Sequence, residues 1–171
     1  MKGFTPGLFD RLMGMPLRAA AHGASGARLS AEDMKDAVAR DLEALLNTRS
    51  VVAEGKLDGY PECSKSMVTY GLCDFADRSL SSPTDRAYIC NCIEQTIACH
   101  EPRLRNVKAL LEMREESVDR SVNRLNFSIT ALLVVSVSQE AVNFDAVLTP
   151  STLQYSIRKA GRAPARGAPG A

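Results

Sequence analysis

The first half of the chain repeats apolar residues with the period of an α-helix. Between Ser30 and Asn47 these residues recur three or four positions apart, which predicts a helix over residues 31–47. They are Met34, Val38, Leu42, Leu45 and Leu46. Ser30 and Asp33 resemble a capping box at the start of this helix. Asn47 tolerates the left-handed conformation and is therefore suited to end it.

A second apolar stripe predicts a helix over residues 84–99. Its members are Tyr88, Ile89, Cys92, Ile93, Thr96 and Ile97. Ser82 followed three residues later by Asp85 marks the start in the same way as in the first helix. Pro102 disfavours helical geometry at the residue before it, so we expect the helix to end near His100.

Three further segments lack a long pattern. Residues 5–13 predict a short amphipathic helix, and residues 14–29 are rich in Gly and Ala, which is typical of a flexible linker. Residues 48–82 show no sustained period and are punctuated by Gly and Pro, so we expect a long ordered loop. Such loops are uncommon in compact domains and are often functional.

Beyond Glu101 the apolar period changes to two, the period of a half-buried strand. The alternating sets are Arg105, Val107, Ala109, Leu111 and Met113; Leu125, Phe127, Ile129, Ala131, Leu133 and Val135; Val142, Phe144, Ala146 and Leu148; and Leu153, Tyr155 and Ile157. Thr149-Pro150-Ser151 separates the last two sets as a turn, which predicts a hairpin. The pattern therefore predicts an α+β fold, with N-terminal helices packed on a C-terminal antiparallel β-meander that ends in a hairpin.

The pattern divides the chain of 171 residues into three parts. We expect an N-terminal helix and flexible linker over 1–29, one α+β domain over 30–158 and a disordered basic tail over 159–171. Lys and Arg number 21 against 20 Asp and Glu, a net charge of +1. Without Arg158, Lys159, Arg162 and Arg166, residues 1–157 hold 17 basic residues against 20 acidic ones, a charge of about −3. This balance argues against a nucleic-acid partner.

Two features of the sequence favour a cytoplasmic protein. The chain has no run of about 18 uninterrupted apolar residues, so we expect no transmembrane helix and no direct membrane insertion. The N-terminal residues lack the hydrophobic core of a secretory signal, which favours reduced thiols.

The five cysteines are odd in number and are expected to act mainly as small buried hydrophobes. They are Cys63, Cys73, Cys90, Cys92 and Cys99. A structural zinc site around Cys90, Cys92 and the Cys99-His100 pair is the alternative, although the chain has no Cys-x-x-Cys pair. We expect neither a metal nor a cofactor.

The sequence offers few groups for catalysis. It has no nucleophile elbow, no phosphate-cradling loop and no metalloprotease helix, and it contains 2 histidines. A glycosidase needs a pair of carboxylates, one with a raised pKa in an apolar pocket. No such pocket marks out the available acids, Asp74, Asp77, Glu94 and Glu101. We therefore expect a non-enzymatic protein with no catalytic residues.

The strongest local feature is Glu101-Pro102-Arg103, where helix gives way to strand. In an extended segment, residues two apart point to the same side. Glu101 and Arg103 would then present a carboxylate and a guanidinium fork together, held by the proline between them. In the alternative interpretation, Arg103 complements the helix C-terminal carbonyls and Glu101 is solvated.

The C-terminal hairpin is the second candidate site. The last strand is expected at the edge of the sheet, where open N–H and C=O groups can accept a strand from another chain. Arg158 and Lys159 could instead blunt this edge with their charges.

Several short motifs follow one another along the chain. They are Asp41-Leu42-Glu43-Ala44-Leu45-Leu46-Asn47-Thr48-Arg49, Tyr70-Gly71-Leu72-Cys73-Asp74-Phe75, Glu101-Pro102-Arg103-Leu104, Leu125-Asn126-Phe127 and Val142-Asn143-Phe144-Asp145. Together they resemble the TssE family, the baseplate subunits of bacterial type VI secretion systems. They occur in the family's order over roughly residues 5–158. The family is similar to the sheath-seeding wedge proteins of contractile-tailed phages. Two departures are Cys73, where the family usually has proline, and His100, where it often has an aromatic residue.

The resemblance implies a structural protein that binds the baseplate components TssF, TssG and TssK and templates the sheath of TssB and TssC. It also implies a cytoplasmic location, in a baseplate near the inner membrane. Docking is expected at Glu101, Pro102 and Arg103. Sheath seeding is expected at the terminal strands, through Val142, Phe144, Ala146, Leu148, Leu153, Tyr155 and Ile157. The family often carries the label lysozyme-like, so a peptidoglycan hydrolase is the alternative function.

Overall fold

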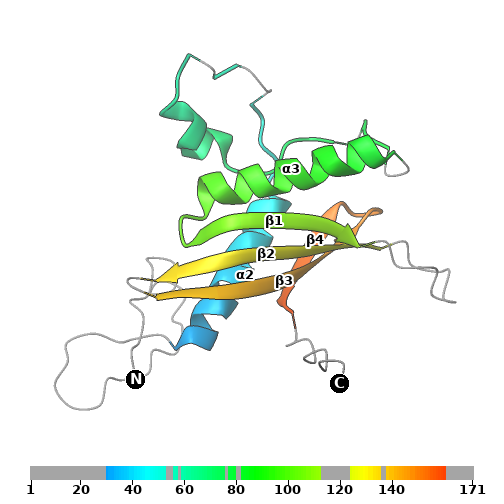
Figure 1. Ribbon diagram of the computed structural model, residues 1–171. Coiled ribbons are helices and arrows are strands. Elements are labelled where there is room, and N and C mark those ends of the chain that lie inside the picture. Colours follow the sequence, from blue (N-terminus) through cyan, green and yellow to red (C-terminus); the bar gives the residue numbers. More distant parts are fainter. Residues whose placement is uncertain are drawn as a thin grey trace, which may run out of the picture.

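A four-stranded antiparallel sheet forms the second half of the chain, and two helices cover one of its faces (Figure 1). The computed structural model describes residues 30–52, 56–57, 59–75, 77–79, 82–112, 124–135 and 138–160. The strand order β1-β2-β3-β4 is that of a simple meander. The predicted α+β arrangement is therefore confirmed. The predicted helix over 5–13 and the tail beyond residue 160 lie outside the described residues.

The first described helix, α2 (Ala31–Asn47), has the predicted bounds. Its capping box is complete, because the Asp33 N–H donates to Ser30 Oγ at 3.1 Å and the Ser30 N–H donates to Asp33 Oδ2 at 3.1 Å. The prediction for Asn47 was wrong in detail. Asn47 stays helical, and Thr48 ends the helix in an extended conformation.

The second helix, α3 (Pro83–His100), agrees with its prediction to within one residue at each end. Ser82 Oγ accepts the Asp85 N–H at 3.3 Å, and Pro83 occupies the first turn, where a missing N–H costs nothing. Of the predicted stripe, Ile89, Ile93 and Ile97 are buried.

The strands are β1 (Leu104–Glu112), β2 (Leu125–Val135), β3 (Ser138–Thr149) and β4 (Gln154–Lys159). β2 matches its prediction, whereas β3 begins four residues earlier than the apolar alternation suggested. Leu153 was predicted to lie in the last strand but lies in the preceding turn, with a positive φ of 55°. A residue with that conformation cannot continue the pleat of β4.

β1 departs from strict alternation at a β-bulge. Its register with β2 shifts between Arg105 and Lys108, so that two residues of β1 face one of β2. Asn106 sits in the bulge with φ 52°, a left-handed conformation that Asn adopts more easily than most residues. The shift explains why Arg105 is exposed although the period-two pattern grouped it with buried Val107 and Ala109.

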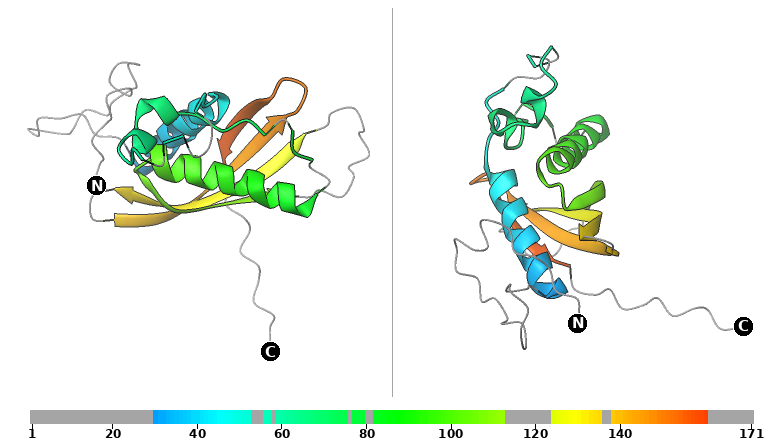
Figure 2. Two further views of the ribbon diagram at one scale, coloured as in Figure 1. Left: turned by 90° about the horizontal axis from the view of Figure 1, so that it is seen from above. Right: turned by 90° about the vertical axis from the view of Figure 1, so that its left-hand side faces the viewer.

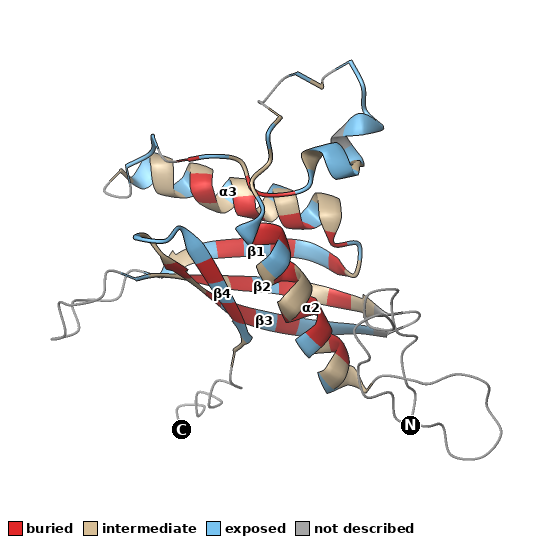
Figure 3. Cartoon of the chain, turned by 180° about the vertical axis from the view of Figure 1, so that it is seen from behind, coloured by how far each residue is buried: buried red, intermediate tan, exposed pale blue. Residues whose placement is uncertain are grey.

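One face of the sheet and the two helices enclose the core (Figure 3). α3 lies beside β1 and α2 beside β4, as the views in Figure 2 show. The largest fully buried side chains include Phe127 and Phe144 of the sheet and Leu42 and Leu46 of α2. No described helix covers the opposite face of the sheet, which we call its open face.

The predicted loop over 48–82 contains two short 3-10 helices, η1 (Cys63–Lys65) and η2 (Met67–Thr69). Its end returns to the domain, where Leu72 forms a bridge with Arg49 and is fully buried. Gly71 allows this approach, because its φ is 120° and a Cβ there would lie 2.7 Å from the Thr48 carbonyl oxygen. No helix of the described part is long and apolar enough to cross a membrane.

The bulge provides a test of the backbone conformation. We predict that Asn106→Val lowers the free energy of unfolding by about 1–3 kcal/mol, because a β-branched residue is strained at positive φ. Asn106→Gly should stay within about 1 kcal/mol of the wild type. Urea unfolding monitored by circular dichroism measures both variants. Equal losses in the two variants would argue against a left-handed residue at this position.

Candidate functional site

The segment Glu101-Pro102-Arg103 forms a tight corner between α3 and β1. The Glu101 side chain is directed inward, and the residue is only 5% exposed. Arg103 closes on it, with Nε donating to Oε1 at 2.7 Å, Nη2 donating to Oε2, and its backbone N–H donating to Oε1 at 3.1 Å. Three donors from one residue therefore satisfy a buried carboxylate, as such a charge requires.

Arg103 also connects this corner to α2. Its Nη2 donates to Asp41 Oδ2 at 2.6 Å, across 62 positions of sequence. We call Asp41, Glu101 and Arg103 the corner cluster. Burial lowers the pKa of Arg103, but the hydrogen bonds and charges of Glu101 and Asp41 outweigh that effect and raise the pKa overall. The guanidinium is therefore a permanent charge that joins α2 to the start of the sheet.

The corner cluster changes the interpretation of the predicted docking residues. The guanidinium fork binds two carboxylates of its own chain, so its first role is to stabilise the corner. Neither interpretation from the sequence included Asp41, since no spacing rule relates a residue of α2 to one 62 positions later. Pro102 is exposed at the tip of the corner and Arg103 is partly exposed. Docking at this corner stays a prediction.

The long loop is fixed to the same corner through His100. The His100 Nε2 atom lies 3.0 Å from the Thr69 carbonyl oxygen, and the His100 ring meets Tyr70 edge-on at 5.5 Å between centroids. Burial raises the pKa of Tyr70, and the charges of Asp41 and Glu101 add to the effect. Thr69 and Tyr70, at the end of η2, therefore contact the residue that directly precedes Glu101 of the corner cluster.

The predicted sheath-seeding side chains face the core. Val142, Phe144, Ala146, Leu148, Tyr155 and Ile157 are all buried, whereas Leu153 is exposed in the turn. The Tyr155 hydroxyl is buried and has no hydrogen-bond partner among the described residues, and burial raises its pKa. A partner that binds these strands would have to use their backbone or their other face.

The edge of β4, predicted to be open, is already hydrogen-bonded to α2. The Tyr155 N–H donates to Asn47 Oδ1 at 2.8 Å, and Asn47 Nδ2 donates to the Tyr155 carbonyl at 2.9 Å. The Ile157 N–H donates to Glu43 Oε2 at 2.7 Å. These two side chains of α2 occupy the groups that an added strand would need.

The other edge of the sheet has a similar arrangement. Glu94 of α3 accepts the Ala109 N–H at 2.9 Å and pairs with Lys108 Nζ at 3.0 Å. Burial raises the pKa of the Cys90 thiol, and a hydrogen bond with the Leu111 backbone partly offsets that rise. β1 is therefore bonded at positions 109 and 111 by side chains of one helix. We call Glu43, Asn47, Cys90 and Glu94 the edge caps.

Helix and strand geometry explains why the edge caps come in pairs. Four residues of a helix advance about 6.0 Å along its axis, and two residues of a strand advance about 6.6 Å. A helix beside a strand edge can therefore present side chains at i and i+4 to backbone groups at j and j+2. Both helices do so in this chain.

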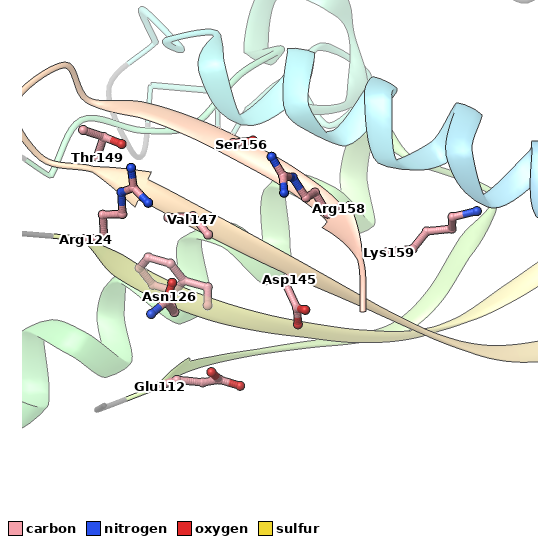
Figure 4. A pocket seen from close by; sticks show the side chains of 10 residues that line it. Glu112, Arg124, Asn126, Asp145, Val147, Thr149, Ser156, Arg158 and Lys159 are labelled. Atoms are coloured by element: carbon pink, nitrogen blue, oxygen red, sulfur yellow. The ribbon is translucent and has the colours of Figure 1, made fainter. Parts of the chain in front are cut away.

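The open face of the sheet holds a hollow of about 580 Å³. Exposed side chains of both charges line it, among them Glu112, Arg124, Asp145 and Arg158 (Figure 4). The four candidate catalytic acids are not among its lining residues. Glu94 is bonded to the Ala109 backbone and Glu101 to Arg103. Asp77 Oδ1 lies 3.7 Å from Arg78 Nε.

None of the five cysteines forms a disulfide. Within the described ranges, no three His, Cys, Asp or Glu side chains are grouped closely enough to hold a metal ion. Cys90 and Cys92 are partly buried and pack against the core, as small hydrophobes do.

A family model described as baseplate wedge protein gp25 matches residues 32–137. The chain belongs to this family. The match includes the corner cluster and all four edge caps, and it ends before β3. It confirms the family that the sequence motifs suggested. Comparison of this gp25-family chain with curated proteins and with solved structures found no match.

The corner cluster predicts a large effect of removing its cation. We expect Arg103→Met to lower the free energy of unfolding by about 3 kcal/mol, because it leaves the buried Glu101 carboxylate without its donors. Adding Glu101→Gln should restore part of the loss by removing the charge. Exposed Arg105→Met is the matched control, with a change within about 0.5 kcal/mol. Urea denaturation at pH 7 compares the four proteins, and a fully stable Arg103→Met variant would contradict the proposed role of the cluster.

The edge caps predict a smaller, local effect. Asn47→Leu should cost about 1–3 kcal/mol, because the Tyr155 N–H and carbonyl lose their partner. The amide hydrogen of Tyr155 should also exchange faster with deuterium. Exposed Asn91→Leu on α3 is the control for the change of residue type. Unchanged exchange at Tyr155 would show that the cap is not formed in solution.

Proposed function

We propose that this gp25-family protein is a structural subunit of a type VI secretion baseplate. Membership of the family supports a structural role in a baseplate wedge. The finer assignment rests on the TssE-like motifs, in particular Glu101-Pro102-Arg103 and Tyr70-Gly71-Leu72. Its partners are then TssF, TssG and TssK in the wedge and TssB and TssC in the sheath. Its place is cytoplasmic, at a baseplate near the inner membrane.

The observation that best supports docking at the corner is the loop beside it. Met67 is 91% exposed, and Tyr60 and Val68 are also exposed large hydrophobic side chains. Apolar side chains gathered at one place on a surface commonly mark a protein interface. The contacts of His100 with Thr69 and Tyr70 join this loop to the corner cluster. We infer that the loop and the corner form one wedge-binding surface.

The contacts of the acidic residues favour a non-enzymatic role over a peptidoglycan hydrolase. A glycosidase acid must exchange a proton with its substrate, and its partner carboxylate must face the same cleft. Glu101 is buried against Arg103, and Glu94 is bonded to the backbone of β1. A glycosidase acid must face its substrate, whereas Glu101 is only 5% exposed and its carboxylate oxygens are bonded to Arg103.

The loop surface gives a direct test of the proposed function. Met67→Glu should weaken binding to a purified TssF–TssG–TssK wedge at least tenfold without lowering the melting temperature, because the side chain is exposed. Leu110→Glu, which changes an exposed leucine on the open face of the sheet, is the matched control and should bind normally. Surface plasmon resonance measures both. Failure of the wild-type protein to bind the wedge would contradict the proposed function itself.

A further inference from the structure

The open face of the sheet carries a second hollow, in front of the first half of β3. Its volume is about 380 Å³, and Thr130, Leu132, Ala141 and Asn143 contribute to its lining. Leu132 and Ala141 are paired across β2 and β3, so two apolar side chains lie next to each other on this face. We call this feature the β3 hollow.

The apolar surface continues along β2 beyond the β3 hollow. Val134 is the next residue of β2 on the open face, and like Leu132 it is only partly buried. Ala141 is exposed. Neither α2 nor α3 covers this surface, because both helices lie on the core side of the sheet. The described part of the chain therefore leaves the apolar lining of the β3 hollow without a cover.

The start of α2 lies close to this end of β3 (Figure 1). Lys35 of α2 pairs with Glu140 at 2.7 Å, and Glu140 directly precedes Ala141. Among the described strands, only β2 pairs with residues 138–142 of β3. A chain that leads into α2 can therefore pass round this edge of the sheet from the open face.

Residues 5–13, which precede α2 in the chain, carry apolar side chains of the size that the β3 hollow could take up. Leu8, Phe9 and Leu12 form one stripe of the predicted amphipathic helix. A flexible linker of the length of residues 14–29 has a root-mean-square span of about 20–24 Å. α2 itself is about 26 Å long, so this reach favours a site near the start of α2 over the loop surface at its other end.

The charges between the two sites are complementary. Residues 1–29 have a net charge of +3, from Lys2, Arg11, Arg18 and Arg28 against Asp10. The surface around the start of α2 is acidic in what it exposes. Glu32, Asp36 and Glu140 are more than half exposed, whereas Lys35 and Lys159, which pair with them, are mostly covered. A basic linker is therefore attracted to the edge that it has to pass.

We infer that residues 5–13 dock as an amphipathic helix in the β3 hollow of the same chain, with Leu8, Phe9 and Leu12 against Leu132 and Ala141. The linker passes round the end of β3 beside the acidic side chains of α2. Docking covers apolar surface that α2 and α3 leave exposed, and burial of that surface drives it. It needs no baseplate partner and so goes beyond the proposed function.

The C-terminal tail reaches the same place but lacks the side chains to fill it. The Ala160 N–H donates to the Asn143 carbonyl at 3.0 Å, so the chain leaves the sheet beside the β3 hollow. Residues 161–171 contain only Gly, Ala, Pro and Arg. The apolar area that these residues could bury is small, which favours the stripe of residues 5–13 as the occupant.

Limited digestion of the full chain with trypsin tests the docking. Arg11 lies in the docked segment and Arg18 in the predicted linker, so one digest compares both sites. Cleavage at Arg11 should be at least about tenfold slower than at Arg18, because the helix must first leave the hollow. Ala141→Glu puts a charge in the hollow and should remove this difference. Ser156→Glu, at an exposed position elsewhere on the open face, is the matched control and should keep it. Melting curves show whether each variant is folded.

Nuclear Overhauser effects identify the occupant directly. We expect contacts of the Phe9 ring with the methyl groups of Leu132 and Ala141 within one chain, in a sample that mixes two differently labelled chains. Contacts only between differently labelled chains would assign the hollow to a second copy and overturn the inference. Equal cleavage at Arg11 and Arg18 in the wild type would overturn it as well, as would slow cleavage at Arg11 that Ala141→Glu leaves unchanged. Neither measurement involves wedge or sheath components, so the proposed function is tested separately by the binding of the Met67→Glu variant.

Discussion

The fold of this chain depends on closing the two edges of an open sheet. An unpaired edge strand exposes a row of backbone donors and acceptors, which either bind another chain or must be satisfied within the molecule. Here the helices that cover the core also serve the edges, because Glu43 and Asn47 bond β4 and Glu94 bonds β1. The core-facing stripe and the edge caps lie on neighbouring sides of the same helices, so burial of the stripe also fixes the caps.

The corner cluster holds these two helices in their places. Asp41 lies on the same helix as Glu43 and Asn47, and its bond to Arg103 fixes that helix against the start of β1. Loss of the guanidinium would therefore affect both the buried Glu101 charge and the position of α2 over the sheet. The surface proposed for wedge binding depends on the same arrangement, because the loop meets the corner through His100.

The sequence predicted the elements well where a local pattern was strong. The bounds of α2 and β2 agree with their apolar periods, and Ser30 and Asp33 form the predicted box. Predictions were weaker where a distant partner decides the conformation. The bulge at Asn106, the turn position of Leu153 and the early start of β3 at Ser138 depend on pairing with other strands, which periodicity does not report.

The sequence by itself determined the fold class, the family motifs and the presence of a polar corner at Glu101, because these follow from local composition and spacing. Only the tertiary structure decided which groups are free to bind. It joined Arg103 to Asp41 and closed the β4 edge with Asn47. The physical reason is that hydrogen-bond satisfaction is settled between groups far apart in the chain, and no spacing in the sequence records which of them meet.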